Sequence, residues 1–146
     1  MKKNIIISSL LMLSMFCFFG FYANSFEFQK KGSQSTDKGI GPIKEVKLGN
    51  IDQRLVDKGN DIYNSKCSAC HNIDDINLAP PLRGVSKSLS PVFIMNYLMN
   101  TTEMQKKDPN VKKLIQDWKK VPMMKDQHLK ENEARAVLEY LRSLDK

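Results

Sequence analysis

The chain has 146 residues, 41% of them hydrophobic, and 23 lysines and arginines against 16 aspartates and glutamates give it a formal net charge of +7. The length favours a single domain, and the composition is ordinary for a globular protein. The positive charge suits an acidic protein partner or an anionic membrane surface. The lysines are scattered in pairs without a recognisable nucleic-acid-binding module, so no nucleic acid is expected as a partner.

The N-terminus has the layout of a targeting or anchoring segment. Lys2 and Lys3 precede an apolar run from Ile5 to Tyr22, and small residues follow it. Residues 1–25 are therefore predicted to be a signal peptide or an N-terminal membrane anchor, in the latter case through residues 4–23. Either alternative places the rest of the chain in the periplasm or on the extracytoplasmic face of the inner membrane.

Residues 26–50 are rich in glycine, serine and lysine and show no sustained periodicity. We expect a flexible linker there and a folded domain over residues 51–146. Only two of the three cysteines, Cys67 and Cys70, belong to this domain, so no disulfide framework is available to it.

The domain is predicted to be all-α with long loops. A broken helical spacing covers residues 51–66, and a loop with consecutive prolines follows the histidine at position 71. Ser90-Pro91 begins a predicted helix over residues 91–100, and Asp108-Pro109 begins the next. The last helix has the clearest apolar stripe, formed by Ala134, Val137, Leu138, Leu141 and Leu144.

The segment Cys67-Ser68-Ala69-Cys70-His71 is the strongest chemical signal in the chain. A structural zinc site needs four ligands, and His128 is the only other histidine. A thiol redox motif needs a βαβ setting, which the helical pattern does not supply. Two structural cysteines beside an incidental histidine remain a third interpretation. Haem fits best, because two thiols on one helical turn can each add to a vinyl group while the next histidine reaches the iron.

Residues 51–146 resemble the small bacterial class I cytochromes c. Gly59-x-x-x-Tyr63-x-x-x-Cys67 is similar to the lead into the family's haem motif, and the closing "VLEYLRSL", with Tyr140, resembles its last helix. The loop "LAPPLRGV" resembles the family's proline loop, with Pro80 nine residues after His71. Ala79 replaces a usual glycine, and Lys130 stands where the family often has serine or threonine. The resemblance implies four to five helices around one covalently bound haem c, with the Tyr140 ring packed near Gly59.

The resemblance also implies the site residues. Cys67 and Cys70 would form the thioethers and His71 would bind the iron, with its ring N–H donated to the Pro80 carbonyl oxygen. A methionine after a proline would supply the sixth ligand, and Met123, directly after Pro122, is preferred over Met124, with His128 as a rival. The indole of Trp118 would support a haem propionate. The candidate pocket walls are Leu78, Leu82, Val85, Phe93, Tyr97 and Val121.

The implied function is one-electron transfer in an extracytoplasmic respiratory chain, without enzymatic activity. The electron acceptor would be an oxidase or a reductase, because "LSPVFIMNYLMNTTEMQKKDPNVKKL" resembles a segment of cytochromes that accompany periplasmic reductases, including those of denitrification. The alternative is an open-site haem enzyme or gas sensor. Redox partners with an acidic docking patch would be steered by Lys66, Lys87 and Lys125 around the haem edge.

Overall fold

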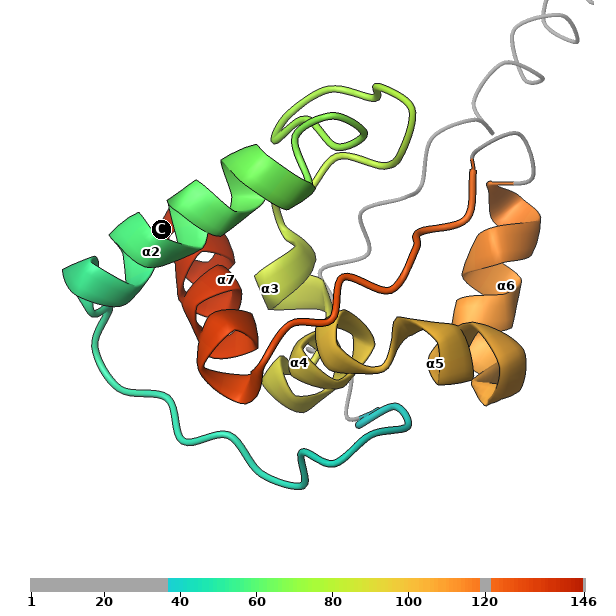
Figure 1. The fold of residues 1–146 in the computed structure, drawn as a ribbon, viewed down its shortest axis with the longest axis horizontal. Coiled ribbons are helices and arrows are strands. Elements are labelled where there is room, and N and C mark those ends of the chain that lie inside the picture. The colour runs from blue at the N-terminus through green and yellow to red at the C-terminus, as the bar shows by residue number, and fades with distance from the viewer. Residues whose placement is uncertain (1–36, 119–121, 146) are drawn as a thin grey trace, which may run out of the picture. The chain divides into compact units, whose positions relative to one another are not determined.

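The computed structural model describes residues 37–118 and 122–145, all of which belong to the compact unit formed by residues 32–146. The predicted signal peptide or anchor lies outside the described residues. Within the described ranges, no helix is both long and apolar enough to span a bilayer. The helices are α2 (Gln53–Lys66), α3 (Val85–Ser88), α4 (Pro91–Met99), α5 (Thr101–Lys107), α6 (Pro109–Asp117) and α7 (Glu131–Leu144), as Figure 1 shows.

The predicted all-α class is confirmed, since the described residues form helices and loops without a strand. The predicted helices agree closely with α2, α4, α6 and α7. The short helices α3 and α5 are additional, because each is too brief to show an apolar stripe in the sequence. Helix α3 lies inside the predicted proline-rich loop, and α5 follows α4 after a single residue, Asn100.

Helices α2 and α7 cross and pack against each other, as the green and red ribbons of Figure 1 show. A Cβ atom built on Gly59 would lie 2.1 Å from the backbone oxygen of Ala136 and 2.8 Å from the Cβ of Tyr140. Only a glycine therefore lets the two helices approach this closely. One turn later the rings of Tyr63 and Tyr140 meet at a centroid distance of 5.4 Å, so Tyr140 packs beside Gly59 as expected.

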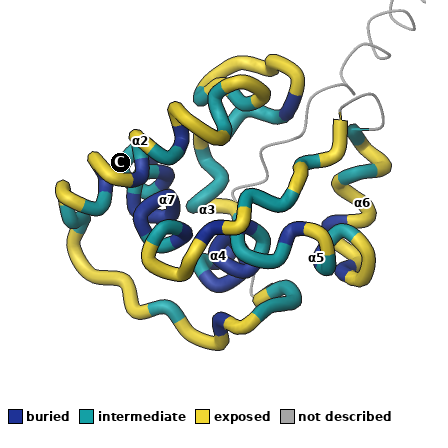
Figure 2. Tube along the Cα trace, in the orientation of Figure 1, coloured by how far each residue is buried: buried dark blue, intermediate teal, exposed yellow. Residues whose placement is uncertain are grey.

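The core has two parts, which appear as dark blue tube in Figure 2. The larger part joins α4 to α7, and its members include Ile94, Leu98, Val137 and Leu138. The smaller part lies under α5 and α6 and consists of Phe93, Met104 and Val111. Helix α4 contributes to both, which explains why its residues are apolar almost all round.

Residues 37–50, predicted as part of a flexible linker, contain a segment that packs against α4. The buried side chain of Asn96 accepts a hydrogen bond from the Ile43 N–H at 2.9 Å and donates to the carbonyl oxygens of Ile43 at 3.0 Å and Lys38 at 2.9 Å. Ile43 itself is buried in the larger core. The part of this segment around Ile43 is therefore held to α4 by tertiary hydrogen bonds, although the sequence has no periodic pattern there.

The helix starts follow the sequence signals. Ser90 Oγ accepts from the Phe93 N–H at 3.0 Å, and Asp108 Oδ1 accepts from the Val111 N–H at 3.0 Å. At the start of α7, the carboxylate of Glu133 accepts from the Lys130 backbone N–H at 2.8 Å. Glu133 thereby supplies half of a capping box, although the lysine side chain has no acceptor atom to complete it.

Candidate functional site

The two cysteines and the histidine form a tight turn at the end of α2. The Cys67 N–H donates to the Tyr63 carbonyl oxygen at 2.8 Å, and the His71 N–H donates to the Cys67 carbonyl oxygen at 2.9 Å. The Tyr63 hydroxyl closes the turn by donating to the His71 carbonyl oxygen at 2.7 Å. Neither Cys67 nor Cys70 is in a disulfide. Both thiols are therefore free and lie three residues apart on one turn.

The ring of His71 is oriented by the proline loop. Its Nδ1 lies 2.7 Å from the carbonyl oxygen of Pro80. Because a carbonyl oxygen can only accept, Nδ1 is the donor in this contact, and in the neutral imidazole the lone pair then lies on Nε2. The loop is held to the turn by backbone hydrogen bonds, from the Ala79 N–H to the Cys70 oxygen at 3.0 Å and from the Leu82 N–H to the Asn72 oxygen at 3.1 Å.

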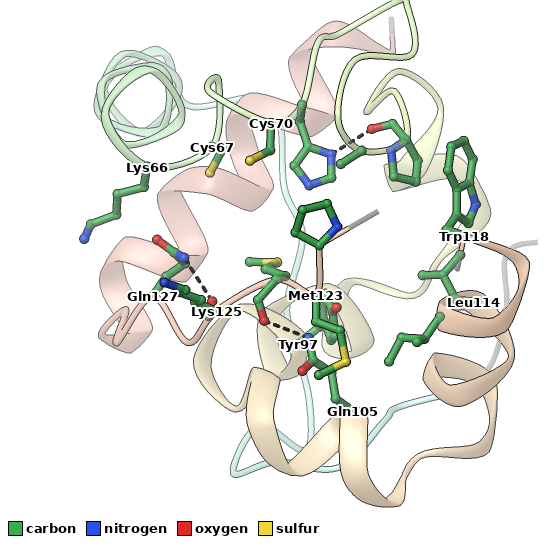
Figure 3. A pocket seen from close by; sticks show the side chains of 16 residues that line it. Lys66, Cys67, Cys70, Tyr97, Gln105, Leu114, Trp118, Met123, Lys125 and Gln127 are labelled. Atoms are coloured by element: carbon green, nitrogen blue, oxygen red, sulfur yellow. Dashed lines mark hydrogen bonds between the residues drawn. The ribbon is translucent and has the colours of Figure 1, made fainter. Parts of the chain in front are cut away.

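These residues open onto a cavity of about 330 Å³ (Figure 3). Its walls come from the end of α2, the proline loop, helices α4 to α6 and the loop before α7. In Figure 3, Cys67 and Cys70 lie at one edge, Leu114 of α6 and Trp118, directly after α6, line another, and Met123 lies near Tyr97 and Gln105. The predicted site residues on the cavity are Cys67, Cys70, His71, Pro80, Trp118, Met123 and the alternative Met124.

The other candidate ligand and most of the candidate wall residues lie away from the cavity. The side chain of His128, the rival ligand, is 88% exposed and does not line the cavity. Tyr97 does line it, whereas Leu78 is 54% exposed and Phe93 belongs to the smaller core. Leu82 and Val85 pack against the larger core instead. Val121 lies outside the described residues. Of the five described wall candidates, only Tyr97 is therefore placed on the cavity.

Two lining residues carry amides that the sequence did not single out. Gln105 comes from α5, and its Nε2 donates to the Met124 carbonyl oxygen at 2.8 Å. Gln127 donates within its own loop to the Lys125 carbonyl oxygen at 2.9 Å. No sequence signal marks either glutamine, and the contact of Gln105 arises only because α5 lies against the methionine loop.

Burial and nearby charges shift the pKa values of side chains on the cavity, and two lysines lie at its lining. Burial raises the pKa of the Cys67 thiol, and the nearby Lys66 ammonium partly opposes this. Burial likewise raises the pKa of the Tyr97 phenol. Two of the three lysines expected at the site, Lys66 and Lys125, line the cavity. Lys87, at the last turn of α3, does not line it, which corrects the expectation for that residue.

The donor set of this cavity fits a haem c. Two thiols on one turn, an imidazole with its Nε2 lone pair free and two thioethers meet around walls that are mainly apolar. Apolar walls with a few convergent polar groups are typical of cofactor pockets. Thioether and imidazole are the axial ligands of low-spin electron-transfer cytochromes.

The comparisons with known proteins agree with this fit. A family model described as cytochrome c matches residues 56–145. A search of curated proteins finds no match. Among solved structures, a cytochrome c from Rhodothermus marinus is 43% identical with a TM-score of 0.67, over 71% of this chain and 89% of that chain.

Two engineered forms of the Rhodothermus marinus protein match similarly. One, Rma TDE, is 42% identical with a TM-score of 0.66 and covers 71% of this chain and 90% of that chain. The other is Rma TDE bound to a carbene intermediate, at 41% identity and a TM-score of 0.64, over 71% and 89% of the two chains. The family match decides between the interpretations of the pentapeptide in favour of haem. The chain belongs to the cytochrome c family, as a class I member with covalently bound haem c and an electron-transfer function.

Proposed function

We propose that this protein carries single electrons between redox proteins outside the cytoplasm. Cys67 and Cys70 hold the haem through thioethers, His71 supplies one axial ligand, and a methionine of the 122–124 loop supplies the other. The observation that carries this proposal is the His71 ring, whose Nδ1 bond to Pro80 at 2.7 Å leaves Nε2 for the iron on a cavity that both methionines line.

Met123 is the proposed methionine ligand, with Met124 as the alternative. Met123 follows Pro122 directly, lines the cavity and is 61% exposed. Met124 is partly buried against the larger core, and its carbonyl oxygen is bonded to Gln105. The indole of Trp118, on the same cavity, is proposed as the group that supports a propionate.

The bound haem c supplies reversible one-electron exchange at its iron. The residues of the chain limit the haem to electron transfer by binding its iron from both sides. His71 and the methionine would together hold the iron and would leave no coordination position for oxygen or peroxide. The half-buried Tyr97 and Ile115 line the cavity on the side of α4 and α6, where their side chains would limit the access of water to a bound haem. A non-enzymatic carrier is the function that this arrangement supports.

The visible absorption spectrum of the exported holoprotein tests the ligand set. We expect a six-coordinate low-spin spectrum with a weak far-red sulfur-to-iron band, which one of the variants Met123→Ala and Met124→Ala abolishes and the other keeps. Cys67→Ala and Cys70→Ala should each leave a single thioether, visible as a shifted reduced band. A high-spin wild-type spectrum that binds carbon monoxide readily would instead indicate an open-site enzyme or gas sensor.

The cellular role completes the proposal. Residues 1–25 act as a signal peptide or anchor, residues 26–50 connect it to the domain of residues 51–146, and this domain works in the periplasm or on the outer face of the inner membrane. There it donates to an oxidase or to a reductase, including one of the denitrification type. Fractionation of cells followed by N-terminal sequencing tests this: recovery of the holoprotein in the cytoplasm would refute it.

Lys66 and Lys125 are proposed to steer an acidic partner to the cavity edge, which both line as exposed residues. Two small oxidants can test this without a known partner. Lys66→Glu and Lys125→Glu should each slow oxidation by anionic hexacyanoferrate(III) at low ionic strength and accelerate oxidation by a cationic tris(phenanthroline)cobalt(III). Both effects should shrink at about 1 M salt, where the Debye length is roughly 3 Å.

Lys87→Glu is the matched control, because it makes the same charge change away from the cavity lining. Its effect on both oxidants should be smaller than that of either other variant. Equal effects from all three positions would show that net charge alone, and no local docking surface, governs the encounter.

A further inference from the structure

The two sides of the cavity are held with very different numbers of hydrogen bonds. On the histidine side, backbone hydrogen bonds join the turn to the proline loop at several points, including Ala79 to Cys70, Leu82 to Asn72 and Arg83 to Ile73. In residues 122–128, the described part of the methionine loop, two of the hydrogen bonds are local, from Gln127 and from the His128 N–H.

A single hydrogen bond between described residues ties this loop to a helix. Gln105 Nε2 donates to the Met124 carbonyl oxygen at 2.8 Å. The donor lies on α5, directly after the fully buried Met104, and Thr101 at the start of α5 is also buried and donates to the Tyr97 carbonyl oxygen at 2.7 Å. The amide therefore projects from a firmly packed helix onto an otherwise weakly held loop.

The side chain of Gln105 also lies beside a residue of α4. It interacts with the side chain of Tyr97, which lies on the same cavity wall. Figure 3 shows Tyr97, Gln105 and Met123 close together at that wall. With Tyr97 on one side and the Met124 carbonyl on the other, the glutamine joins α4, α5 and the methionine loop.

We propose that Gln105 is a positioning residue for the iron-binding methionine. By holding the Met124 carbonyl, it limits how often the loop swings out of the cavity, and thereby how long the thioether stays on the iron. The inference rests on the proposed methionine ligation. It applies to Met123 and to Met124 alike, because the bonded carbonyl lies in the peptide chain next to both.

The expected size of the effect follows from the loss of one neutral hydrogen bond. Such a loss shifts a local equilibrium by roughly fivefold. The packing of Met124 against the core and of Leu129 within it remains in the variant, so the loop stays folded in most molecules. Local opening, and not global unfolding, is the property that should change.

The test compares full-length holoprotein variants. Gln105→Leu removes the amide, and Gln105→Glu keeps the size of the side chain while an ionised carboxylate cannot donate to a carbonyl. Gln116→Leu, at an exposed position of α6, is the matched control for the substitution itself. Amide hydrogen exchange of residues 123–128 and of α7 is followed by mass spectrometry, together with the limiting rate at which imidazole replaces the methionine on ferric iron.

We expect both Gln105 variants to increase the rate of amide exchange in residues 123–128 and the limiting rate of imidazole binding, each by roughly fivefold. Amide exchange in α7 should not change, and Gln116→Leu should give the wild-type rates. The reduction potential should fall in the two Gln105 variants, because a thioether favours ferrous iron. Exchange that matches the control, or that rises equally in the loop and in α7, would overturn the positioning role.

The same measurements separate this inference from the function on which it rests. An imidazole rate that never saturates in the wild type, with Met123→Ala and Met124→Ala behaving alike, would refute methionine ligation and with it the positioning role. A saturating wild-type rate that the Gln105 variants leave unchanged would refute only the role of Gln105.

Discussion

Replacing Gly59 by alanine tests the packing that places the haem-binding turn. The added Cβ would lie 2.1 Å from the Ala136 oxygen and 2.7 Å from the Ala136 carbonyl carbon, whereas ordinary contacts begin near 3.4 Å. The obstacle is backbone, so it cannot rotate away, and α2 and α7 must separate. Overpacking of this kind costs up to about 3 kcal/mol, and the better helix propensity of alanine returns about 1 kcal/mol. We therefore expect Gly59→Ala to lower the free energy of unfolding by about 2 kcal/mol.

Urea denaturation of the holoprotein, followed by far-ultraviolet circular dichroism, measures this loss. Gly49→Ala is the control, because a Cβ at Gly49 meets nothing within 4 Å and its φ is not in the left-handed region. It should stay within about 0.5 kcal/mol of wild type. A Gly59→Ala protein as stable as Gly49→Ala would refute the view that the α2–α7 contact depends on the missing side chain.

Four further substitutions, at Glu139, Gly84 and Tyr97, test a buried carboxylate, a left-handed backbone position and a pH-dependent group. Glu139→Ala should lower the free energy of unfolding in urea by about 3 kcal/mol. It removes the buried carboxylate that the guanidinium groups of Arg135 and Arg142 contact at 2.9 and 2.8 Å. A loss below about 1 kcal/mol would contradict this prediction. Gly84→Ala should cost about 1 kcal/mol, since φ is 84° and the space around it is open, and Gly84→Asn should cost less. Burial raises the pKa of Tyr97 in the folded protein above its value in the unfolded chain, which is about 10. The buried neutral phenol therefore contributes fully to the free energy of unfolding below about pH 10, and this contribution is lost as the pH rises through the folded pKa. Between pH 9 and 11, the free energy of unfolding should therefore fall more steeply for wild type than for Tyr97→Phe. Parallel plots of this free energy against pH for the two proteins would contradict the prediction.

The parts of the fold that the sequence predicts well are those set by local chemistry. The Ser90-Pro91 and Asp108-Pro109 signals lie at the observed starts of α4 and α6, because capping involves residues within one turn. The apolar stripe of α7 is periodic and becomes the buried face. The loop from His71 to Pro80 was predictable from its resemblance to the family, and its hydrogen bond is present at 2.7 Å.

Other features depend on contacts between distant residues and leave no local pattern. The segment around Ile43 has the composition of a linker, yet Asn96, 53 residues away, satisfies its backbone. Gln105 is an ordinary polar residue until α5 brings its amide to the methionine loop. The sequence gives no reason to distinguish the charges of Lys66, Lys87 and Lys125. Only the packing of α2, α3 and the methionine loop places Lys66 and Lys125 at the cavity and Lys87 away from it.

The sequence by itself therefore determined the kind of chemistry, because two cysteines, a histidine and their spacing along one turn are local properties of the chain. The tertiary structure alone decided which side chains from α4, α5, α6 and the methionine loop surround that turn. A cavity forms where separate elements leave space between them, and the burial and long-range hydrogen bonds that shape it arise only when those elements pack.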